Sequence, residues 1–213
     1  MAEHYVSDDE QVEAIKKWWK TNGMGIVAGL VIGAVGVLGW QYWGSYQTER
    51  AEQASLFYDA LRGAMRGNDA AQIREQGEIL LNDYDDTAYA TLAALMLAKV
   101  EVQDGNPEAA AQHLQWVLDN ASQAVVKDLA RVRLARVRLS EGRLDDAEAQ
   151  LSQVHNFNLT AEVEELRGDI HVARGDVPKA RIAYEAAQAA AGPTGGELLQ
   201  IKLDNLPAEG AQG

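Results

Sequence analysis

The sequence lacks cysteine entirely. This absence excludes disulfide frameworks, thiolate zinc sites, iron–sulfur clusters and cysteine nucleophiles. Proline occurs four times and phenylalanine twice in 213 residues. No stretch alternates convincingly between apolar and polar residues, so we expect no β-strands. Alanine is very frequent, which is typical of a helical protein with close contacts between its helices.

Positive charge is scarce. The formal net charge is −13, and the part after Trp43 holds 27 acidic and 16 basic residues, a net charge of −11. Nucleic acid is therefore an unlikely partner, because its affinity for proteins comes largely from phosphate neutralisation by lysine and arginine. A strongly acidic surface favours solubility and repels anionic lipid headgroups.

Familiar catalytic and ligand-binding motifs are missing too. The four histidines share no ligand spacing: His4, His113, His155 and His171. No Gly-x-Ser-x-Gly elbow or Gly-Lys-Ser/Thr phosphate loop occurs, and the glycine-rich residues 192–196, which contain no lysine, are expected to be a helix connection. Adjacent carboxylates point about 100° apart on a helix, so they do not converge on one substrate. We therefore expect no catalytic, metal or cofactor site and no small-molecule substrate.

One long apolar run is present. Residues 23–40, GMGIVAGLVIGAVGVLGW, contain no charged or strongly polar side chain, and Trp18, Trp19, Trp40 and Trp43 lie at the two ends of the run. A helix needs about 20 apolar residues to cross the hydrocarbon layer, and amphipathic rings prefer the headgroup level. The run predicts a transmembrane helix over residues 23–43.

Two other interpretations of this run fit less well. A cleaved signal peptide has a short basic leader and a small-x-small cleavage site, whereas here the leader exceeds twenty residues, is acidic in part, and the run ends in tryptophan. A buried core helix should carry a polar stripe, and this run has none.

Flanking charge predicts the orientation. Lys16, Lys17 and Lys20 directly precede the run, whereas only Arg50 lies in the comparable stretch after it. Because positive residues stay on the cytoplasmic side, residues 1–22 are expected to be a cytoplasmic leader and residues 44–213 an exported domain, periplasmic in a Gram-negative bacterium.

The predicted span also carries glycines on one sector. They are spaced by four, four, three and three residues: Gly25, Gly29, Gly33, Gly36 and Gly39. Small residues on one face allow close approach of another membrane helix. The alternative is that glycine is simply common in membrane spans.

After the span the chain shows a repeated pattern. Gly105, Gly142 and Gly175 are 37 and 33 residues apart. Small residues lie seven positions before each glycine and five after it, and larger apolar residues lie mainly nine and twelve after it: Ala98, Ala135 and Gly168; Ala110, Ala147 and Ala180; Leu114, Leu151 and Tyr184; Val117, Val154 and Ala187. Such helix–turn–helix units of about 34 residues resemble the tetratricopeptide repeat.

The turns and ends fit this interpretation. Each glycine can end one helix, and Asn106 or Asp176 can cap the next. A degenerate further unit is plausible around Gly67. The apolar residues between Leu198 and Leu206 are expected to form a helix that caps the last repeat. The predicted fold class is all-α, with one N-terminal transmembrane helix followed by a tetratricopeptide-like helical-repeat domain.

In such arrays the first helix of each unit lines the concave surface. The alignment assigns twelve residues to a candidate partner-binding face: Leu92, Leu95, Lys99, Val102, Leu129, Val132, Arg136, Leu139, Glu162, Glu165, Asp169 and Val172. The face is expected to run from apolar to acidic, with Lys99 and Arg136 as its only basic residues, which suits a polypeptide better than a small ligand. The alternative is that its leucines and valines simply close the core.

Motifs along the whole chain carry a family resemblance. They are Asp9 to Lys16 (DEQVEAIK), Asn22-Gly23, Gly39 to Trp43 (GWQYW), Leu134 to Val137 (LARV), Leu166 to Asp169 (LRGD), Gly175-Asp176 and Ile201 to Leu206 (IKLDNL). In these motifs the sequence resembles the YfgM-type ancillary subunits of the SecYEG translocon. The leader and exit motifs are specific in combination, whereas the repeat motifs alone are generic.

The resemblance implies a bacterial inner-membrane protein with a periplasmic tetratricopeptide-like domain. It implies two partners, the SecYEG translocon and a membrane-anchored periplasmic chaperone of the PpiD type, and a non-enzymatic role in passing translocated proteins to periplasmic chaperones. Composition and periodicity alone leave two alternatives, a cell-envelope scaffold and a membrane-tethered regulator that signals through residues 1–22.

Overall fold

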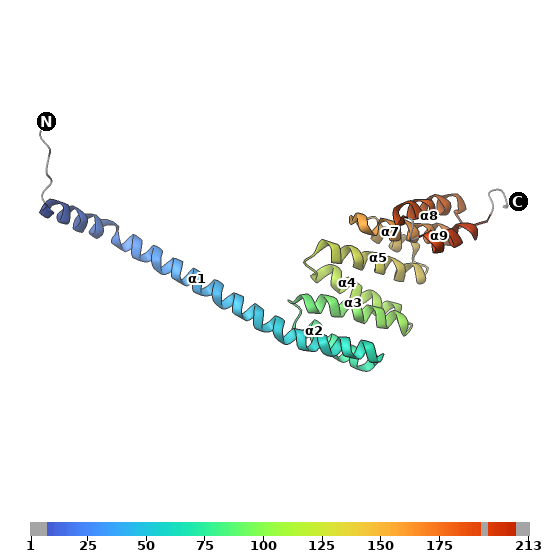
Figure 1. The fold of residues 1–213 in the computed structure, drawn as a ribbon, viewed down its shortest axis with the longest axis horizontal. Coiled ribbons are helices and arrows are strands. Elements are labelled where there is room, and N and C mark those ends of the chain that lie inside the picture. Colours follow the sequence, from blue (N-terminus) through green and yellow to red (C-terminus); the bar gives the residue numbers. More distant parts are fainter. Residues whose placement is uncertain (1–7, 193–195, 208–213) are drawn as a thin grey trace, which may run out of the picture. The chain divides into compact units, whose positions relative to one another are not determined.

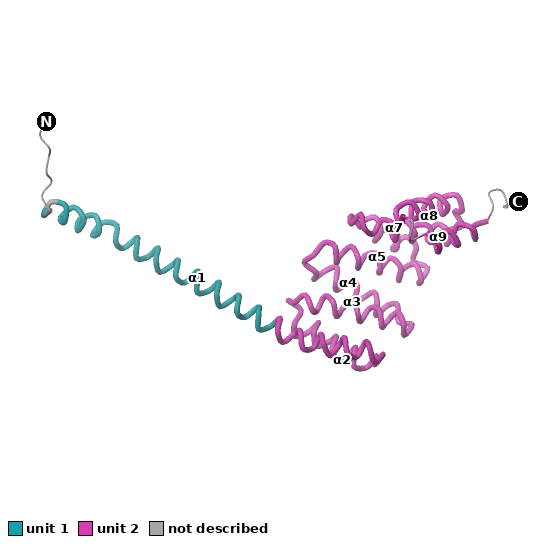
Figure 2. The backbone as a smooth tube through the Cα atoms, in the orientation of Figure 1, with its two compact units in different colours: residues 1–50 teal, residues 51–213 magenta. Residues whose placement is uncertain are grey.

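The computed structural model describes residues 8–192 and 196–207. The start of the predicted leader with His4, residues 193–195 of the predicted connection, and residues 208–213 of the predicted exported domain lie outside this description. All described elements are helices (Figure 1). The prediction of an all-α fold is therefore confirmed. Two compact units divide the chain, Met1–Arg50 and Ala51–Gly213 (Figure 2).

The first unit consists of the N-terminal part of α1 (Asp8–Gly67). Its apolar side chains are open to the surroundings, with Met24 84% exposed, Leu30 69% and Ile32 73%. Among the described helices, α1 is the one that is both long enough and apolar enough to cross a membrane. Such continuous exposed apolar surface is unfavourable in water and favourable in lipid. The boundaries 23 and 43 of the span, and those of the flanking segments, stay predictions.

Polar side chains just before the apolar run are satisfied within the helix itself. The Thr21 hydroxyl donates to the carbonyl of Lys17 at 3.0 Å, and the Asn22 amide donates to the carbonyl of Trp18 at 3.1 Å. Bonding to the carbonyl four residues earlier is an ordinary local solution for such side chains. It lets the helix carry polar groups up to the edge of the apolar run.

The second unit is a succession of helical hairpins. It begins with residues 51–67 of α1, and its described part continues with eight further α-helices and one short 3₁₀ turn: α2 (Ala70–Asp83), α3 (Ala88–Gln103), α4 (Pro107–Asn120), α5 (Ala124–Ser140), α6 (Leu144–Leu151), η1 (Phe157–Leu159), α7 (Thr160–Ala173), α8 (Val177–Ala191) and α9 (Gly196–Asp204). Short connections join α3 to α4, α5 to α6 and α7 to α8. These three hairpins are the units that the sequence repeat predicts.

The three aligned glycines do end helices in the left-handed region. Gly105, Gly142 and Gly175 have φ of 77°, 74° and 76°. Only glycine reaches this region without a steric penalty from Cβ, so each glycine reverses the chain after a first helix. The hairpin formed by the end of α1 and α2 also exists, but Asn68, with φ of 55°, turns the chain there and Gly67 is the last helical residue.

Capping follows the prediction at one of the two named positions. The Asp176 carboxylate accepts the N–H of Lys179 at 3.2 Å at the start of α8. Asn106 occupies the corresponding position before α4 but makes no side-chain cap. Its amide instead donates to Glu101 at 3.0 Å. Glu101 is buried and also accepts from Arg74 of α2 at 2.6 Å, and this interaction lowers the pKa of its carboxyl group.

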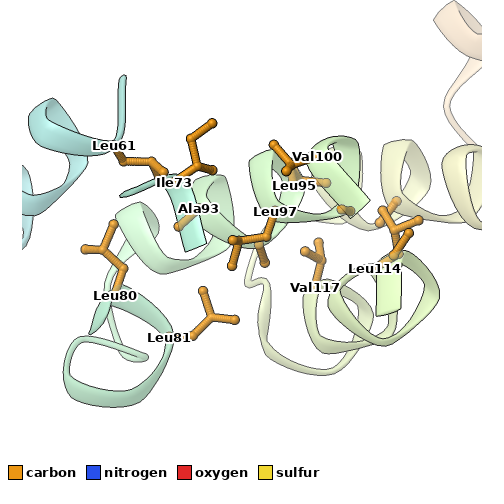
Figure 3. Close-up of a cluster of buried hydrophobic side chains, with 14 of the residues drawn as sticks. Leu61, Ile73, Leu80, Leu81, Ala93, Leu95, Leu97, Val100, Leu114 and Val117 are labelled. Carbon is orange, nitrogen blue, oxygen red and sulfur yellow. The ribbon is translucent and has the colours of Figure 1, made fainter. Parts of the chain in front are cut away.

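The core consists of three consecutive apolar clusters. The first extends from the end of α1 to α5 and contains Leu61, Leu80, Leu97 and Leu114, of which Figure 3 shows the packing. The second joins α5, α6 and α7, and the third joins α8 and α9. Apolar burial of this kind is the main driving force of folding. The small residues of the repeat lie within this core, and Ala110, Ala147 and Ala180 have no exposed surface at all.

The second hairpin departs from the other two. Helix α6 ends at Leu151, so Val154 lies in a loop and not in a helix like its counterparts Val117 and Ala187. The reason is the buried carboxylate of Asp128, which accepts the N–H groups of His155 and Asn156 at 3.1 and 2.9 Å. These two bonds hold the loop against α5. They occupy backbone donors that a longer α6 would use internally.

Candidate partner-binding groove

A groove of about 530 Å³ lies between the first helices of the first two repeats. Helix α3 contributes five lining residues, α4 one and α5 four: Leu95, Ala98, Lys99, Val102, Gln103, Leu114, Arg133, Arg136, Val137 and Ser140. Its volume is in the range of ordinary ligand-binding clefts. The floor is largely apolar, and three cationic side chains border it.

The groove contains four of the twelve residues that the sequence assigned to the concave face, namely Leu95, Lys99, Val102 and Arg136. Lys99 is exposed and Val102 is 53% exposed, so both are accessible. Leu95 is 7% exposed and contributes mainly to the floor. The membership of these four in a partner-binding face stays a prediction.

The other residues of the predicted face are distributed differently. Val132 is fully buried in the second core cluster and offers no surface to a partner. Leu129 and Leu139 are half-buried and pack against the core, as the alternative interpretation expected for such residues. Leu92 and Val172 are exposed but do not line this groove.

A second depression of about 270 Å³ continues from Arg136 toward the C-terminal end of the repeat array. Glu162 and Glu165 of α7 line it together with Leu198 and Leu199 of α9. Helix α9 therefore lies beside the face of α7 that carries Glu162 and Glu165. Leu199 and Leu203 of α9, and Leu206 just after it, are buried in one cluster with α8 residues, which agrees with the predicted capping helix.

The acidic residues of the predicted face form ion pairs within the domain, and the expected gradient from apolar to acidic stays a prediction. Lys202 of α9 contacts Glu165 at 2.7 Å and Asp169 at 2.7 Å. Burial by itself would lower the pKa of Lys202, but its hydrogen bonds to Asp169 and Glu165 outweigh this effect and raise the pKa. Arg136 pairs with Glu162 at 2.8 Å. Glu165 and Asp169 thus bind α9 through Lys202, and Glu162 binds α5 through Arg136.

The expectation that Lys99 and Arg136 are the only basic residues is also wrong, because Arg133 lines the same groove. The alignment overlooked it for a geometric reason. Two neighbouring helices present opposite flanks to the groove between them, so α5 contributes Arg133, Arg136, Val137 and Ser140, while α3 contributes the flank around Lys99. The recurrence of basic residues along α5 at spacings of two or three was the available signal.

The described residues contain no group of three or more histidine, aspartate or glutamate side chains that could hold a metal ion. The two described buried side-chain atoms without a hydrogen-bond partner, Glu148 Oε2 and His171 Nδ1, lie away from the groove lining. What the groove offers chemically is apolar surface with positive charge at its border. This combination is suited to binding and provides no nucleophile or general base in a positioned arrangement.

Comparison with known sequences agrees with this description. The family model of the tetratricopeptide repeat-like domain matches residues 16–208, which confirms the predicted repeat class. The ancillary SecYEG translocon subunit of Escherichia coli K12 is 32% identical over 205 residues, covering 96% of this chain and 98% of the relative. The ancillary SecYEG translocon subunit of Haemophilus influenzae is 31% identical over 201 residues, covering 94% and 98%.

A more distant relative shows the same extent of similarity. The ancillary SecYEG translocon subunit of Neisseria gonorrhoeae is 29% identical over 209 residues, covering 97% of this chain and all of the relative. In all three cases the match includes the predicted membrane span as well as the repeats. This family is not an enzyme class. The chain therefore belongs to the family of ancillary SecYEG translocon subunits and carries a tetratricopeptide repeat-like domain.

Proposed function

We propose that this protein is a non-enzymatic, membrane-anchored interaction subunit of the secretion machinery, which associates with the SecYEG translocon in the bacterial inner membrane. The observation that carries the proposal is similarity over nearly the full length, from leader to last helix, to relatives named ancillary SecYEG translocon subunits. A shared repeat fold alone would not carry it, because function resides in sites and not in folds.

The orientation is part of this proposal. Lys16, Lys17 and Lys20 before the apolar run favour a cytoplasmic N-terminus and a periplasmic repeat domain. In that arrangement the repeats lie on the side where secreted chains emerge. The groove between α3 and α5 is accessible to such chains, and we include in the proposal that the domain helps pass them to periplasmic chaperones, with a PpiD-type membrane-anchored chaperone as its partner.

The glycine-rich sector of the span is the proposed contact with a membrane partner. A Cβ added at Gly25, Gly29, Gly33, Gly36 or Gly39 meets nothing within 4 Å in this chain. The chain's own fold therefore does not require these glycines, and their absence of side chains leaves room for a neighbouring helix.

Affinity purification of the full chain in mild detergent tests the function. We expect SecYEG and a periplasmic chaperone to co-purify, and the Gly29→Leu, Gly33→Leu double variant to retain membrane insertion but lose most of its membrane partner. Gly44→Leu, at a glycine that also meets nothing within 4 Å but lies outside the predicted span, is the matched control. Co-purification of only division or cell-wall proteins would contradict the proposal and favour an envelope scaffold.

The orientation has a separate test. An alkaline phosphatase fused after Gly213 is expected to be active, because this enzyme folds productively only outside the cytoplasm and the lysine asymmetry places the C-terminus there. A fluorescent reporter that folds only in the cytoplasm serves as the complementary fusion and should stay dark. A phosphatase fusion that is stably made but inactive, together with a bright cytoplasmic reporter, would reverse the assigned orientation.

A further inference from the structure

Charge pairing along α5 singles out one arginine. Three of the arginines on this helix have acidic partners: Arg131 pairs with Asp128 at 2.9 Å, Arg138 with Glu141 at 2.9 Å, and Arg136 with Glu162 at 2.8 Å. No described residue forms an ion pair or hydrogen bond with the side chain of Arg133. Lys99, across the groove on α3, is likewise without an acidic partner among the described residues.

Lys99 and Arg133 are the two described cations of this groove that form no ion pair; Lys127 and Arg181, outside it, also form none among the described residues. The part of the chain after Trp43 carries a net charge of −11, so carboxylates are abundant and most described arginines have one. Neither Lys99 nor Arg133 forms an ion pair with another described residue, yet both border the same groove. Their positive charge is therefore available to a partner.

The surface between these cations is apolar. Val102 is 53% exposed, and Leu95, Leu114 and Val137 lie below it in the same lining. Covering exposed aliphatic surface is favourable by roughly 25 cal/mol per Å². A carboxylate placed against lysine or arginine at the border of such a surface gains a charge-assisted hydrogen bond. An occupant that combines aliphatic side chains with carboxylates uses both features at once.

Toward the C-terminal end the concave side is bordered differently. Arg136 is already paired with Glu162, and α9 contacts α7 through Lys202. Among the described residues that line these two depressions, the unpaired cations are therefore Lys99 and Arg133 in the groove between α3 and α5. Beyond it, Leu198 is 58% exposed in the second depression and extends the apolar surface.

We propose that the groove between α3 and α5 binds a polypeptide segment in which aliphatic and acidic side chains are interspersed, with Lys99 and Arg133 contacting the carboxylates. This inference rests on the proposed function and names the class of segment that the domain accepts. A polypeptide fits better than an anionic membrane surface, because the net negative charge around the groove repels a charged sheet but tolerates one short acidic segment.

Peptide binding to the full chain in detergent micelles tests this inference. The probe is a fluorescent synthetic peptide that repeats Leu-Glu-Val-Asp, compared by anisotropy with peptides that repeat Leu-Lys-Val-Lys or Ser-Glu-Ser-Asp. We expect the first peptide to bind most tightly. The Lys99→Glu, Arg133→Glu double variant should weaken it by about tenfold or more and should improve binding of the lysine peptide, because reversing the charge of both contacts exchanges attraction for repulsion.

A matched control has the same change of net charge outside the groove. Lys127 of α5 and Arg181 of α8 do not line it, so the Lys127→Glu, Arg181→Glu variant should keep its affinity for the acidic peptide within about twofold if long-range attraction is a minor contribution. Val102→Ser tests the apolar part and should weaken the acidic peptide without changing its preference over the lysine peptide. Circular dichroism of each variant checks that the helices are intact.

Three outcomes would overturn the inference. All three peptides could bind with equal affinity, or the groove variant and its control could lose equal affinity for the acidic peptide. The third is a chain that binds phosphatidylglycerol vesicles and none of the peptides. Translocon co-purification separates this inference from the function. If the chain still co-purifies with the translocon but does not prefer the acidic peptide, only the assignment of the groove is wrong. Lost co-purification with intact peptide selectivity removes the translocon association and leaves a peptide-binding domain.

Discussion

Gly168→Ala is expected to destabilise the repeat domain by about 3 kcal/mol, because a single added methyl group has no space. A Cβ built at Gly168 lies 2.3 Å from two ring carbons of Tyr184. Tyr184 has little freedom to move away, because it is buried and its hydroxyl donates to Asp169 at 2.7 Å. Burial and this bond to a carboxylate also raise the pKa of Tyr184 above its ordinary value.

Chemical unfolding followed by circular dichroism at a helical wavelength measures this effect. Gly63→Ala is the matched control, since Gly63 is also a helical glycine of the second unit but has nothing within 4 Å of an added Cβ. Alanine is favoured over glycine in an open helix, so the control is expected to stabilise the domain by about 0.5–1 kcal/mol. Opposite signs for the same chemical change isolate the steric contribution at Gly168.

The other two repeats indicate which second substitution should compensate for Gly168→Ala. The equivalent pairs in the other two repeats are Ala98 with Leu114 and Ala135 with Leu151, each within one core cluster. Where the third repeat has the large Tyr184, it has glycine opposite. The Gly168→Ala, Tyr184→Leu double variant restores the alanine–leucine pair and should recover at least half of the lost stability, since volume-conserving changes are tolerated best. A double variant less stable than Gly168→Ala alone would show that the two sites do not compensate.

Asp128→Ala is the second substitution with a large expected effect, a loss of about 3 kcal/mol. The carboxylate is 5% exposed, accepts the N–H groups of His155 and Asn156, and pairs with Arg131. Removing it leaves two backbone donors and a guanidinium without their acceptor, and a buried group that loses its partner carries the full desolvation penalty. The loop that follows α6 should detach from α5.

Hydrogen exchange provides the specific readout for this variant. The amides of His155 and Asn156 should lose protection in Asp128→Ala, while amides in α3 keep theirs under conditions where the domain stays folded. Asp119→Ala is the control, because Asp119 is exposed and, among the described residues, accepts a side-chain hydrogen bond only from Gln115; it should change stability by less than about 0.5 kcal/mol. Unchanged protection at residues 155 and 156 would mean that the loop is held by other groups.

The candidate groove was only partly predictable. Lys99 and Arg136 were assigned to it from the repeat alignment, and both line it. Arg133 was missed, because an alignment compares equivalent positions in successive helices and does not show which flank of each helix faces its neighbour. Val132 was assigned for the same reason and is buried. One residue corresponds to about 100° of rotation on a helix, so a small difference in rotation exchanges a lining residue for a core residue.

Short-range patterns along the chain are enough to predict the membrane helix, the hairpin turns and the helix crossings. The apolar run of residues 23–40 predicts a membrane-spanning helix by its length alone. Gly105, Gly142 and Gly175 predict the three hairpin turns, because a left-handed residue after a helix needs glycine, and each of them adopts that conformation. The small residues around these turns predict the close crossings that the core contains.

How charges and shapes meet across the repeats depends instead on the packing of the helices. This packing pairs Lys202 with Glu165 and Asp169, more than thirty positions earlier, so these two acidic residues bind α9. It also leaves Lys99 and Arg133, beside an apolar groove, without acidic partners in the part of the chain that the structure describes. Such pairings depend on how neighbouring helices are rotated and packed, and that is decided by the burial of the whole core and not by the preference of any short segment.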